Sequence, residues 1–471
     1  MARFPRVLKI SLFALGGLVG VLALGVAALL FVDVDSYKPN VEAEASRVLA
    51  MDVKVEGPLR VGLIPALHVK LANVRVSNRG TQLALVEEAD LAVEFLSLMR
   101  KDLHYGDIVL KRVHISVERD RHGDYNFERP AEVEAAFPGL DLDKVSLTGL
   151  TVAYVDKASG DAFEAGNCDG VLTGVRHPGG ATFLSRVSLS GQFACGEVPA
   201  KRAPISDLRF SVEAKEGVFD FKPVTMRSFG GQGSGALHVD HSRTVPVIHL
   251  EYALKEFRID EYFKALLPGV TASGLMHSSI TLSMRGRTRG ELRRSAEGEM
   301  VLSGNNLTLA GIDLDRDLAR YESSQTFNLF DLTAFVFAGP LGLAVTKGTQ
   351  FASLAANEGG STPIRTVVSK WKIEKGVAHA KDVAFTTREN RLALHGGLDF
   401  VNDDFDDVVV ALVDSKGCAK VRQKIRGPFR KPVVEKPDAL ASITGPLRSL
   451  VGKLGSASCE VFYSGSVAPA T

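Results

Sequence analysis

The sequence has almost no excess of either charge. Its 56 Lys and Arg residues balance 55 Asp and Glu residues, which leaves a net charge of +1. A protein that binds nucleic acid through the phosphate backbone presents a basic surface, and this composition gives no sign of one. We therefore expect no nucleic-acid partner. A single Trp against 45 Gly is typical of a chain rich in strands and turns.

Motifs of catalysis and metal binding are missing as well. The four cysteines form no Cys-x-x-Cys pair, and His238 and His241 would point to opposite faces of a strand. The glycine-rich segment Phe229–Ala236 leads into a strand-like LHVD rather than a helix, which favours a hairpin over a phosphate-binding loop. No Gly-x-Ser-x-Gly nucleophile motif occurs. The sequence therefore predicts no enzyme, no metal site and no cofactor.

One long apolar run stands near the N-terminus. Residues 10–32 carry no charge, and a helix of this length would reach about 34 Å, enough to span a hydrocarbon core of roughly 30 Å. The charged flanks are basic before the run and acidic after it: Arg3, Arg6, Lys9, Asp33 and Asp35. By the positive-inside rule, residues 1–9 form a cytoplasmic tail and the rest of the chain is exported.

A cleaved signal peptide is the alternative interpretation of this run. Its apolar region would be about 7–15 residues long and would end at a small-x-small cleavage site. The run at 10–32 is longer, and it ends in the bulky residues Leu29, Leu30, Phe31 and Val32. The sequence therefore favours a single uncleaved transmembrane helix.

After this span, apolar and polar residues alternate with the period of a β-strand. Pairs such as Arg79-Gly80, Glu216-Gly217 and Lys375-Gly376 separate the alternating stretches and indicate hairpins. The alternation predicts a mainly β protein whose strands each have one apolar and one polar face. The apolar positions that share a face of their strand include Val187, Leu189, Phe193, Phe210, Val212, Leu250, Tyr252, Leu254, Ile280, Leu282, Met284, Leu392 and Leu394.

Only a few short helices are expected. Ser36–Leu49 and Asp260–Leu267 have helical spacing, and so does Asp313–Tyr321. Near the end, an apolar stripe from Leu440 to Leu454 predicts an amphipathic helix interrupted at a Gly-Pro pair. We expect three regions after the span: a β-rich region at 33–256, a second at 257–437, and the helix with a terminal strand at 438–471.

The cysteines all follow the predicted span. An even number of cysteines in an exported, oxidising compartment indicates disulfides, although four cysteines allow three pairings. The local pairs, each flanked by strand-like sequence, predict Cys168–Cys195 and Cys418–Cys459.

Several short motifs follow the span in a set order. In the first half they are Leu63-Ile64-Pro65, Val74 to Gly80, Gly106-Asp107-Ile108 and Asp120 to Phe127. In the second half they are FRIDEYFKALL and WKIEKGVAHAKDVAFTTRENRLALHGGLDF. Together with the span, this series resembles the AsmA family of Gram-negative envelope proteins over nearly the whole chain. The tail from Cys418 to Tyr463, with its two cysteines, departs from that pattern.

The resemblance implies a fold and a function. Members of the wider group, which includes TamB-like and chorein-type bridge proteins, have a sheet bent into an elongated trough with an apolar inner face. The implied protein is anchored in the inner membrane with its bulk in the periplasm, and it helps phospholipid transport to, or homeostasis of, the outer membrane. The groove would be lined by the thirteen shared-face positions given above, and its ligand would be a phospholipid or another envelope lipid.

Two alternatives stay open. A sheet with one apolar face must bury that face against another sheet, a helix or a ligand, so packed β-sandwiches with dry cores fit the same periodicity. The alternative function is an interaction scaffold that affects outer-membrane protein assembly through an outer-membrane or periplasmic protein partner, without conducting lipid.

Overall fold

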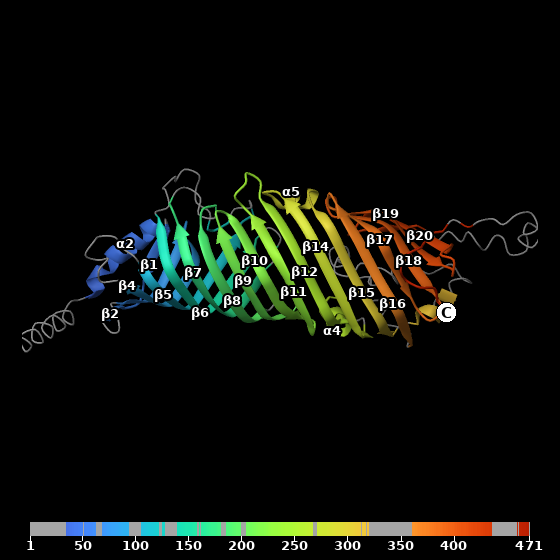
Figure 1. Cartoon of the computed structure of the whole chain (residues 1–471), viewed down its shortest axis with the longest axis horizontal. Coiled ribbons are helices and arrows are strands. Elements are labelled where there is room, and N and C mark those ends of the chain that lie inside the picture. Colours follow the sequence, from blue (N-terminus) through green and yellow to red (C-terminus); the bar gives the residue numbers. More distant parts are fainter. Residues whose placement is uncertain are drawn as a thin grey trace, which may run out of the picture.

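A computed structural model of the chain shows one large open β-sheet of 21 strands with a short helix at its N-terminal end (Figure 1). It describes residues 34–49, 51–62, 68–93, 105–121, 125–127, 139–157, 160, 162–179, 185–198, 204–266, 271–311, 313–316, 318–319, 360–435, 459 and 461–470. The tail at 1–9, the span at 10–32 and the helix predicted from Leu440 to Leu454 lie outside these residues. Within them, no helix has the length and apolar character needed to cross a membrane.

The elements of the first half run from the N-terminal helix to β11. They are η1 (Val34–Tyr37), α2 (Lys38–Leu49), β1 (Asp52–Val55), β2 (Leu59–Gly62), β3 (His68–Asn78), β4 (Thr81–Val93), β5 (Tyr105–Arg119), β6 (Leu140–Asp156), β7 (Ala162–His177), β8 (Ser188–Val198), β9 (Ile205–Lys215), β10 (Val218–Ser228) and β11 (Gly231–Asp240).

The second half contains helices α4 and α5, and residues 314–316 and 318–319, within the helix predicted at Asp313–Tyr321, are also helical. Its elements are β12 (Val247–Arg258), α4 (Ile259–Leu266), β13 (Thr271–Ser273), β14 (Leu275–Arg285), α5 (Arg289–Arg294), β15 (Glu297–Ala310), β16 (Ser361–Glu374), β17 (Val377–Thr386), β18 (Arg391–Asp399), β19 (Asp404–Val413), β20 (Ala419–Pro428) and β21 (Val433–Val434). The helices predicted at Ser36–Leu49 and Asp260–Leu267 are therefore present within a few residues of their expected bounds.

The strands pair almost entirely with their neighbours in the chain. From β3 to β12 and from β14 to β20, each strand pairs antiparallel with the next, except that β5 and β6 run parallel. The short strand β13 pairs with β15 instead. Strand β12 pairs with β14 across α4, so the sheet is continuous where the sequence suggested a boundary. The described strands thus form one sheet rather than a set of separate sandwiches.

Tight turns explain why consecutive strands fold back on each other. Both residues of Arg79-Gly80, Glu216-Gly217 and Lys375-Gly376 have positive φ, between 50° and 85°. Positive φ at both central positions is the mark of the type I′ turn, whose twist matches that of the flanking strands. The glycine-rich segment begins with the same geometry at Phe229-Gly230, which confirms the hairpin predicted there.

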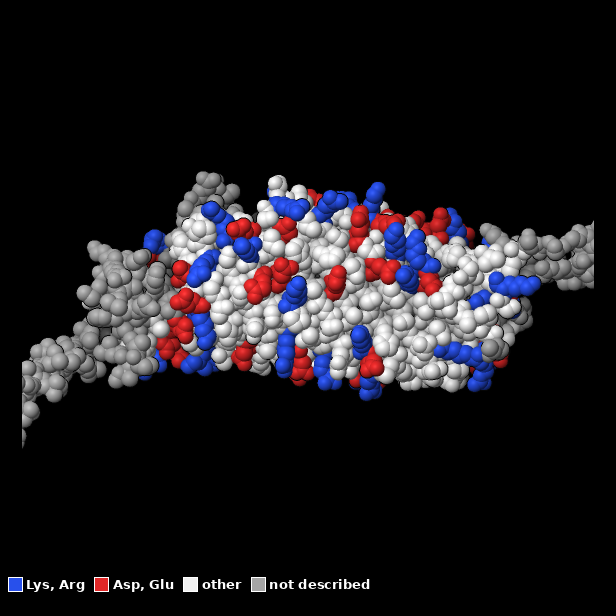
Figure 2. Space-filling model, viewed as in Figure 1, with Lys and Arg blue, Asp and Glu red and all other residues white. Residues whose placement is uncertain are grey.

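The hydrophobic core is densest toward the C-terminal end of the sheet. There Trp371, Phe385 and Leu392 have at most 1% of their surface exposed, and α4 packs against the same core. A smaller core involves β1 to β9. Helices α4 and α5 lie at opposite long edges of the sheet (Figure 1). Figure 2 shows charged side chains of both signs along these two edges.

Both predicted disulfides are present. Cys168 and Cys195 are directly opposite each other on β7 and β8. Cys418, just before β20, is bonded to Cys459 and ties the C-terminal segment to the end of the sheet.

The C-terminal segment packs on the last strands through polar and aromatic contacts. The Tyr463 hydroxyl donates to Asp382 at 2.5 Å, and the Arg391 guanidinium donates to the Val467 carbonyl at 3.0 Å. Tyr463 and Val467 are buried in a cluster with three alanines of β17, β18 and β19. The segment therefore covers part of the sheet with specific contacts. Among its described residues, strand-like pairing is limited to a single bridge between Cys418 and Val461.

Candidate functional site

An apolar pocket with a volume of about 590 Å³ lies on the middle of the sheet, beside α4. Its walls come from strands β9 to β12, β14 and β15. The apolar side chains that line it are Ile205, Phe210, Phe221, Val224, Met226, Phe229, Ala236, Leu237, Leu250, Tyr252, Leu254, Phe257, Tyr262, Ile280 and Met300.

The register of the strands brings these residues onto one face, here called the groove face. Residues directly opposite in antiparallel strands point to the same side of a sheet. One row of opposite residues therefore crosses the sheet from β8 to β16: Phe193, Phe210, Val224, Gly235, Tyr252, Ile280, Met300 and Trp371. A parallel row contains Leu237, Leu250 and Leu282.

Burial changes along this face. Leu250, Tyr252 and Ile280 remain partly exposed, whereas Met300 and Trp371 are 3% and 1% exposed. The groove face is thus accessible at the pocket and closed by packing toward β16.

A row of glycines in β11 makes room for the pocket. Gly231, Gly233 and Gly235 alternate along the strand and share the face of Leu237. A Cβ on Gly233 would overlap the Tyr252 hydroxyl, and one on Gly235 would come within 2.9 Å of the Tyr252 Cα. Because Gly233 and Gly235 have no side chains, the Tyr252 ring can lie directly on the backbone of β11.

An aromatic cluster closes the end of the pocket next to α4. The rings of Phe229, Phe257, Tyr262 and Phe263 have neighbouring centroids 5.4–6.4 Å apart. Helix α4 buries Tyr262 and Phe263 because both fall on its apolar stripe. Burial alone raises the pKa of the Tyr262 and Tyr252 hydroxyls, so both remain neutral and can only donate or accept hydrogen bonds.

The chemistry offered by this pocket is burial of apolar surface. Its walls supply hydrocarbon and aromatic rings, and the other lining residues are Ser228, Ser278, Ser279 and Glu251. Glu251 alternates with Leu250 and Tyr252 along β12, so its carboxylate points to the opposite face of the sheet. Across the described part of the chain, no three His, Cys, Asp or Glu side chains are grouped so that they could hold a metal ion. The arrangement is suited to holding an apolar molecule.

The structure distributes the thirteen predicted groove residues over several places. Those that line the pocket are Phe210, Leu250, Tyr252, Leu254 and Ile280. Those that continue the groove face beside it, on β8, β9 and β14, are Phe193, Val212, Leu282 and Met284.

The remaining four lie away from the pocket. Leu189 packs against a small cluster around Leu142, and Val187 is 1% exposed just before β8. Leu392 and Leu394 are 0% and 6% exposed within the large C-terminal core.

Several lining residues were missed because a β-bulge changes the side to which side chains point. Phe221 and Val224 are an odd number of positions apart, yet both line the pocket, since the register of β10 shifts between them. Pro223 within the strand is the sequence signal that could have revealed this bulge. The aromatic residues around α4 were missed because its apolar stripe does not indicate which face of the sheet it covers.

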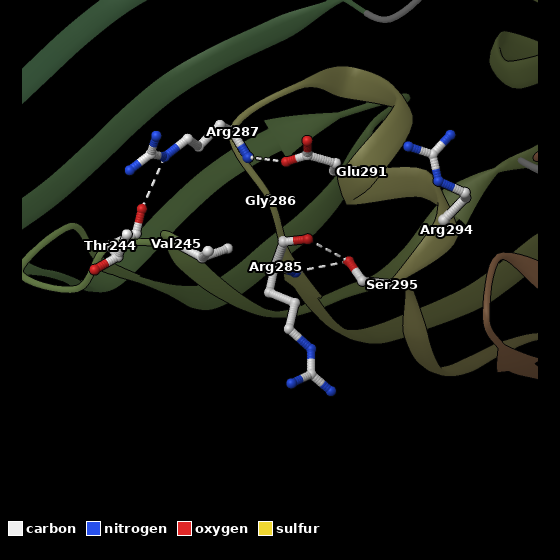
Figure 3. Close-up of a pocket in the computed structure, with 8 residues that line it drawn as sticks. All are labelled: Thr244, Val245, Arg285, Gly286, Arg287, Glu291, Arg294 and Ser295. Atoms are coloured by element: carbon white, nitrogen blue, oxygen red, sulfur yellow. Dashed lines mark hydrogen bonds between the residues drawn. The ribbon is translucent and has the colours of Figure 1, made fainter.

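A second, polar pocket of about 520 Å³ lies at the edge where α5 connects β14 and β15 (Figure 3). It is lined by Thr244, Val245, Arg285, Gly286, Arg287, Glu291, Arg294 and Ser295. The Ser295 hydroxyl joins the two ends of the turn, because it accepts from the Arg285 amide and donates to the Arg285 carbonyl.

The acidic side chain in this pocket is engaged by the backbone. Thr288 caps α5 by accepting from the Glu291 amide at 3.2 Å, and the Glu291 carboxylate accepts from the Arg287 amide at 2.7 Å. Hydrogen bonds from the Arg287 and Thr288 amides, with the nearby charges of Arg294 and Arg287, lower the pKa of Glu291. The negative charge of Glu291 therefore stabilises the turn before α5.

A long single sheet with an apolar pocket on one face defines a groove-bearing β protein. The model of the AsmA family matches residues 4–169 and 183–383, which is most of the chain, and the protein therefore belongs to the AsmA family. No curated protein and no solved structure gave a match. The family match ends within β17, so β18 to β21 and the disulfide-bound C-terminal segment lie beyond it.

Proposed function

We propose that this protein is an envelope lipid-transfer protein that carries phospholipid acyl chains along the groove face. The observation that supports this most directly is the partly exposed apolar pocket between β9 and β15. Each Å² of apolar surface left in water costs about 25 cal/mol, and a contiguous apolar patch on a folded protein is typical of a binding site for a ligand or a partner. An acyl chain is a ligand that covers apolar surface without requiring polar partners.

Membership of the AsmA family and the single large sheet are compatible with this proposal. In our proposal residues 10–32 anchor the chain in the inner membrane, residues 1–9 remain cytoplasmic, and the sheet extends into the periplasm as a trough along which lipid passes toward the outer membrane. No catalytic step is involved.

The test places a charge on the groove face. Leu250 lines the pocket and is partly exposed, so Leu250→Asp can keep its carboxylate in contact with water once lipid is gone. We expect copurified phospholipid to fall severalfold while the melting temperature changes by only a few degrees. The control is Ser234→Asp, because Ser234 is exposed on the opposite face of neighbouring β11.

Two results would contradict the proposal. If Leu250→Asp unfolds the protein, the pocket is a dry core, because an unpaired buried carboxylate costs several kcal/mol. If the wild-type protein carries no lipid, the scaffold function becomes the better explanation.

A further inference from the structure

The apolar pocket and the polar pocket lie along the same strand. Ile280 lines the apolar pocket, and β14 ends five residues later at Arg285, beside the polar pocket. At about 3.3 Å per residue this separation is about 17 Å. Leu282 and Met284 fill the groove-face positions between them, opposite Leu250 and Ile248 of β12. Leu282 and Met284 therefore continue the apolar groove face from the first pocket to the end of β14, where the strand reaches the edge that carries the polar pocket.

The length of this stretch of the groove face matches one leaflet of a bilayer. A hydrocarbon core of about 30 Å gives each leaflet about 15 Å of acyl chain. A lipid whose chain ends reach the pocket beside α4 would therefore have its polar headgroup at the α5 edge.

The α5 edge carries arginines that can receive such a headgroup. Arg287 uses its Nε to donate to the Thr244 carbonyl at 2.8 Å, which orients the guanidinium. Its terminal nitrogens donate to none of the described residues. Among the described residues, the Arg294 guanidinium has no hydrogen-bond acceptor. Both side chains are exposed, and the one carboxylate in the pocket is held by the backbone of the turn.

Figure 3 shows that the guanidiniums do not converge on one point. Arg287 extends toward the β11–β12 loop, Arg294 extends to the other side of α5, and Arg285 points away from both. Such a spread does not form a cage for a small ion. It provides separate guanidinium forks along an edge, each able to make paired hydrogen bonds to phosphate oxygens as a headgroup moves past.

We propose that Arg287 and Arg294 are two separate binding positions for the phosphate of a glycerophospholipid whose acyl chains lie on the groove face and point toward α4. This inference rests on the proposed lipid-carrying function, and it adds the class of headgroup and the direction in which the lipid is held. Gly286 is required for this edge, because a Cβ there would come within 2.5 Å of the Glu291 Cβ in the turn.

The test compares two lipids that differ only in the phosphate. The full-length protein in detergent is titrated with a fluorescent phosphatidic acid and with the diacylglycerol that has the same chains. In Arg287→Gln/Arg294→Gln we expect about tenfold weaker binding of phosphatidic acid and unchanged binding of diacylglycerol. Arg287→Lys/Arg294→Lys should keep most of the affinity. The matched control is Arg209→Gln/Arg227→Gln, which removes two exposed arginines from β9 and β10.

The outcomes separate this inference from the proposed function. If wild-type protein binds neither lipid, the lipid-carrying function fails. If it binds both lipids equally, or if the double Gln variant loses both, the headgroup inference is wrong while lipid binding stands. If inorganic phosphate alone binds as tightly as phosphatidic acid, the edge is a free-phosphate site and the inference is overturned. Loss of phosphatidic acid alone supports it.

Discussion

Tyr252 and the glycines opposite it decide how much space the pocket has. Tyr252 lies between Gly235 on β11 and Ile280 on β14, and its hydroxyl reaches over Gly233. A glycine at either position lacks the side chain that would push the ring outward. The pocket volume therefore depends on two missing side chains as much as on those that form its walls.

Gly233→Ala tests this arrangement. The added methyl group overlaps the Tyr252 hydroxyl, so the ring must turn into the pocket. We expect the free energy of unfolding to fall by about 1–3 kcal/mol, as for other overpacked sites, and lipid binding to fall severalfold. Denaturant unfolding and lipid titration measure the two effects. Ser234→Ala, on the exposed face of the same strand, should change neither. Equal behaviour of both variants would show that the glycine row does not set the pocket.

At the scale of elements, the C-terminal segment is held to the sheet by rings as well as by its disulfide. The His395 ring of β18 stacks on the Phe462 ring, with centroids 4.3 Å apart. The Arg422 guanidinium also lies over the Phe462 ring, 5.5 Å from its centroid. Burial, and to a lesser extent the charge of Arg422, lowers the pKa of His395 below its ordinary value of 6.5. His395 is therefore neutral in the folded protein at pH values where it would be protonated in the unfolded chain.

This shift predicts how stability depends on pH. Above the pKa of about 6.5 that His395 has in the unfolded chain, the imidazole is neutral in both states and the shift does not affect stability. As the pH falls from there toward the lower pKa of the folded state, only the unfolded chain gains a proton at His395, and the folded protein is destabilised. His395→Phe keeps a ring against Phe462 and should remove this part of the pH dependence. Denaturant unfolding of both proteins at about pH 7.5 and about pH 5.5 measures it. An equal loss of stability in both proteins at the lower pH would contradict the prediction.

The elements that sequence patterns predicted are those governed by local rules. Alternation identified the strands, and turns such as Lys375-Gly376 followed from the positive φ that glycine permits. The bulge between Phe221 and Val224 was not predicted, because strict alternation assumes an unbroken register. The bulge reverses the face to which every later residue of the strand points. Nor could alternation distinguish Leu250 from Leu392: it indicates on which side a residue lies, whereas its exposure depends on which distant elements pack there.

At the scale of the whole molecule, the membrane orientation that we propose would determine what the groove can reach. The described sheet has α2 at one end and the C-terminal segment at the other, so an anchor before α2 would leave the far end free to extend away from the membrane (Figure 1). The basic residues before residue 10 set the expected direction.

Reporter fusions test that direction. Alkaline phosphatase fused after Thr471 should be active, because it folds only in an oxidising compartment, and a reporter that works only in the cytoplasm should be silent at the same position. The opposite pair of results would place the sheet in the cytoplasm and would contradict both the disulfide-forming environment and the proposed route for lipid.

The order of strand pairing has a consequence for how such a sheet is made. Apart from the short strand β13, which pairs with β15, each strand after β2 pairs with one that precedes it by one or two positions in the chain. Even the parallel pair β5 and β6 is adjacent in sequence. Contacts between residues close in sequence form quickly and require no distant partner. If the chain is exported as we propose, almost every new strand would have its pairing partner in place as it emerges from the membrane. Assembly would then proceed at the pace of export, and a longer or shorter sheet would require only more or fewer hairpins of the same kind.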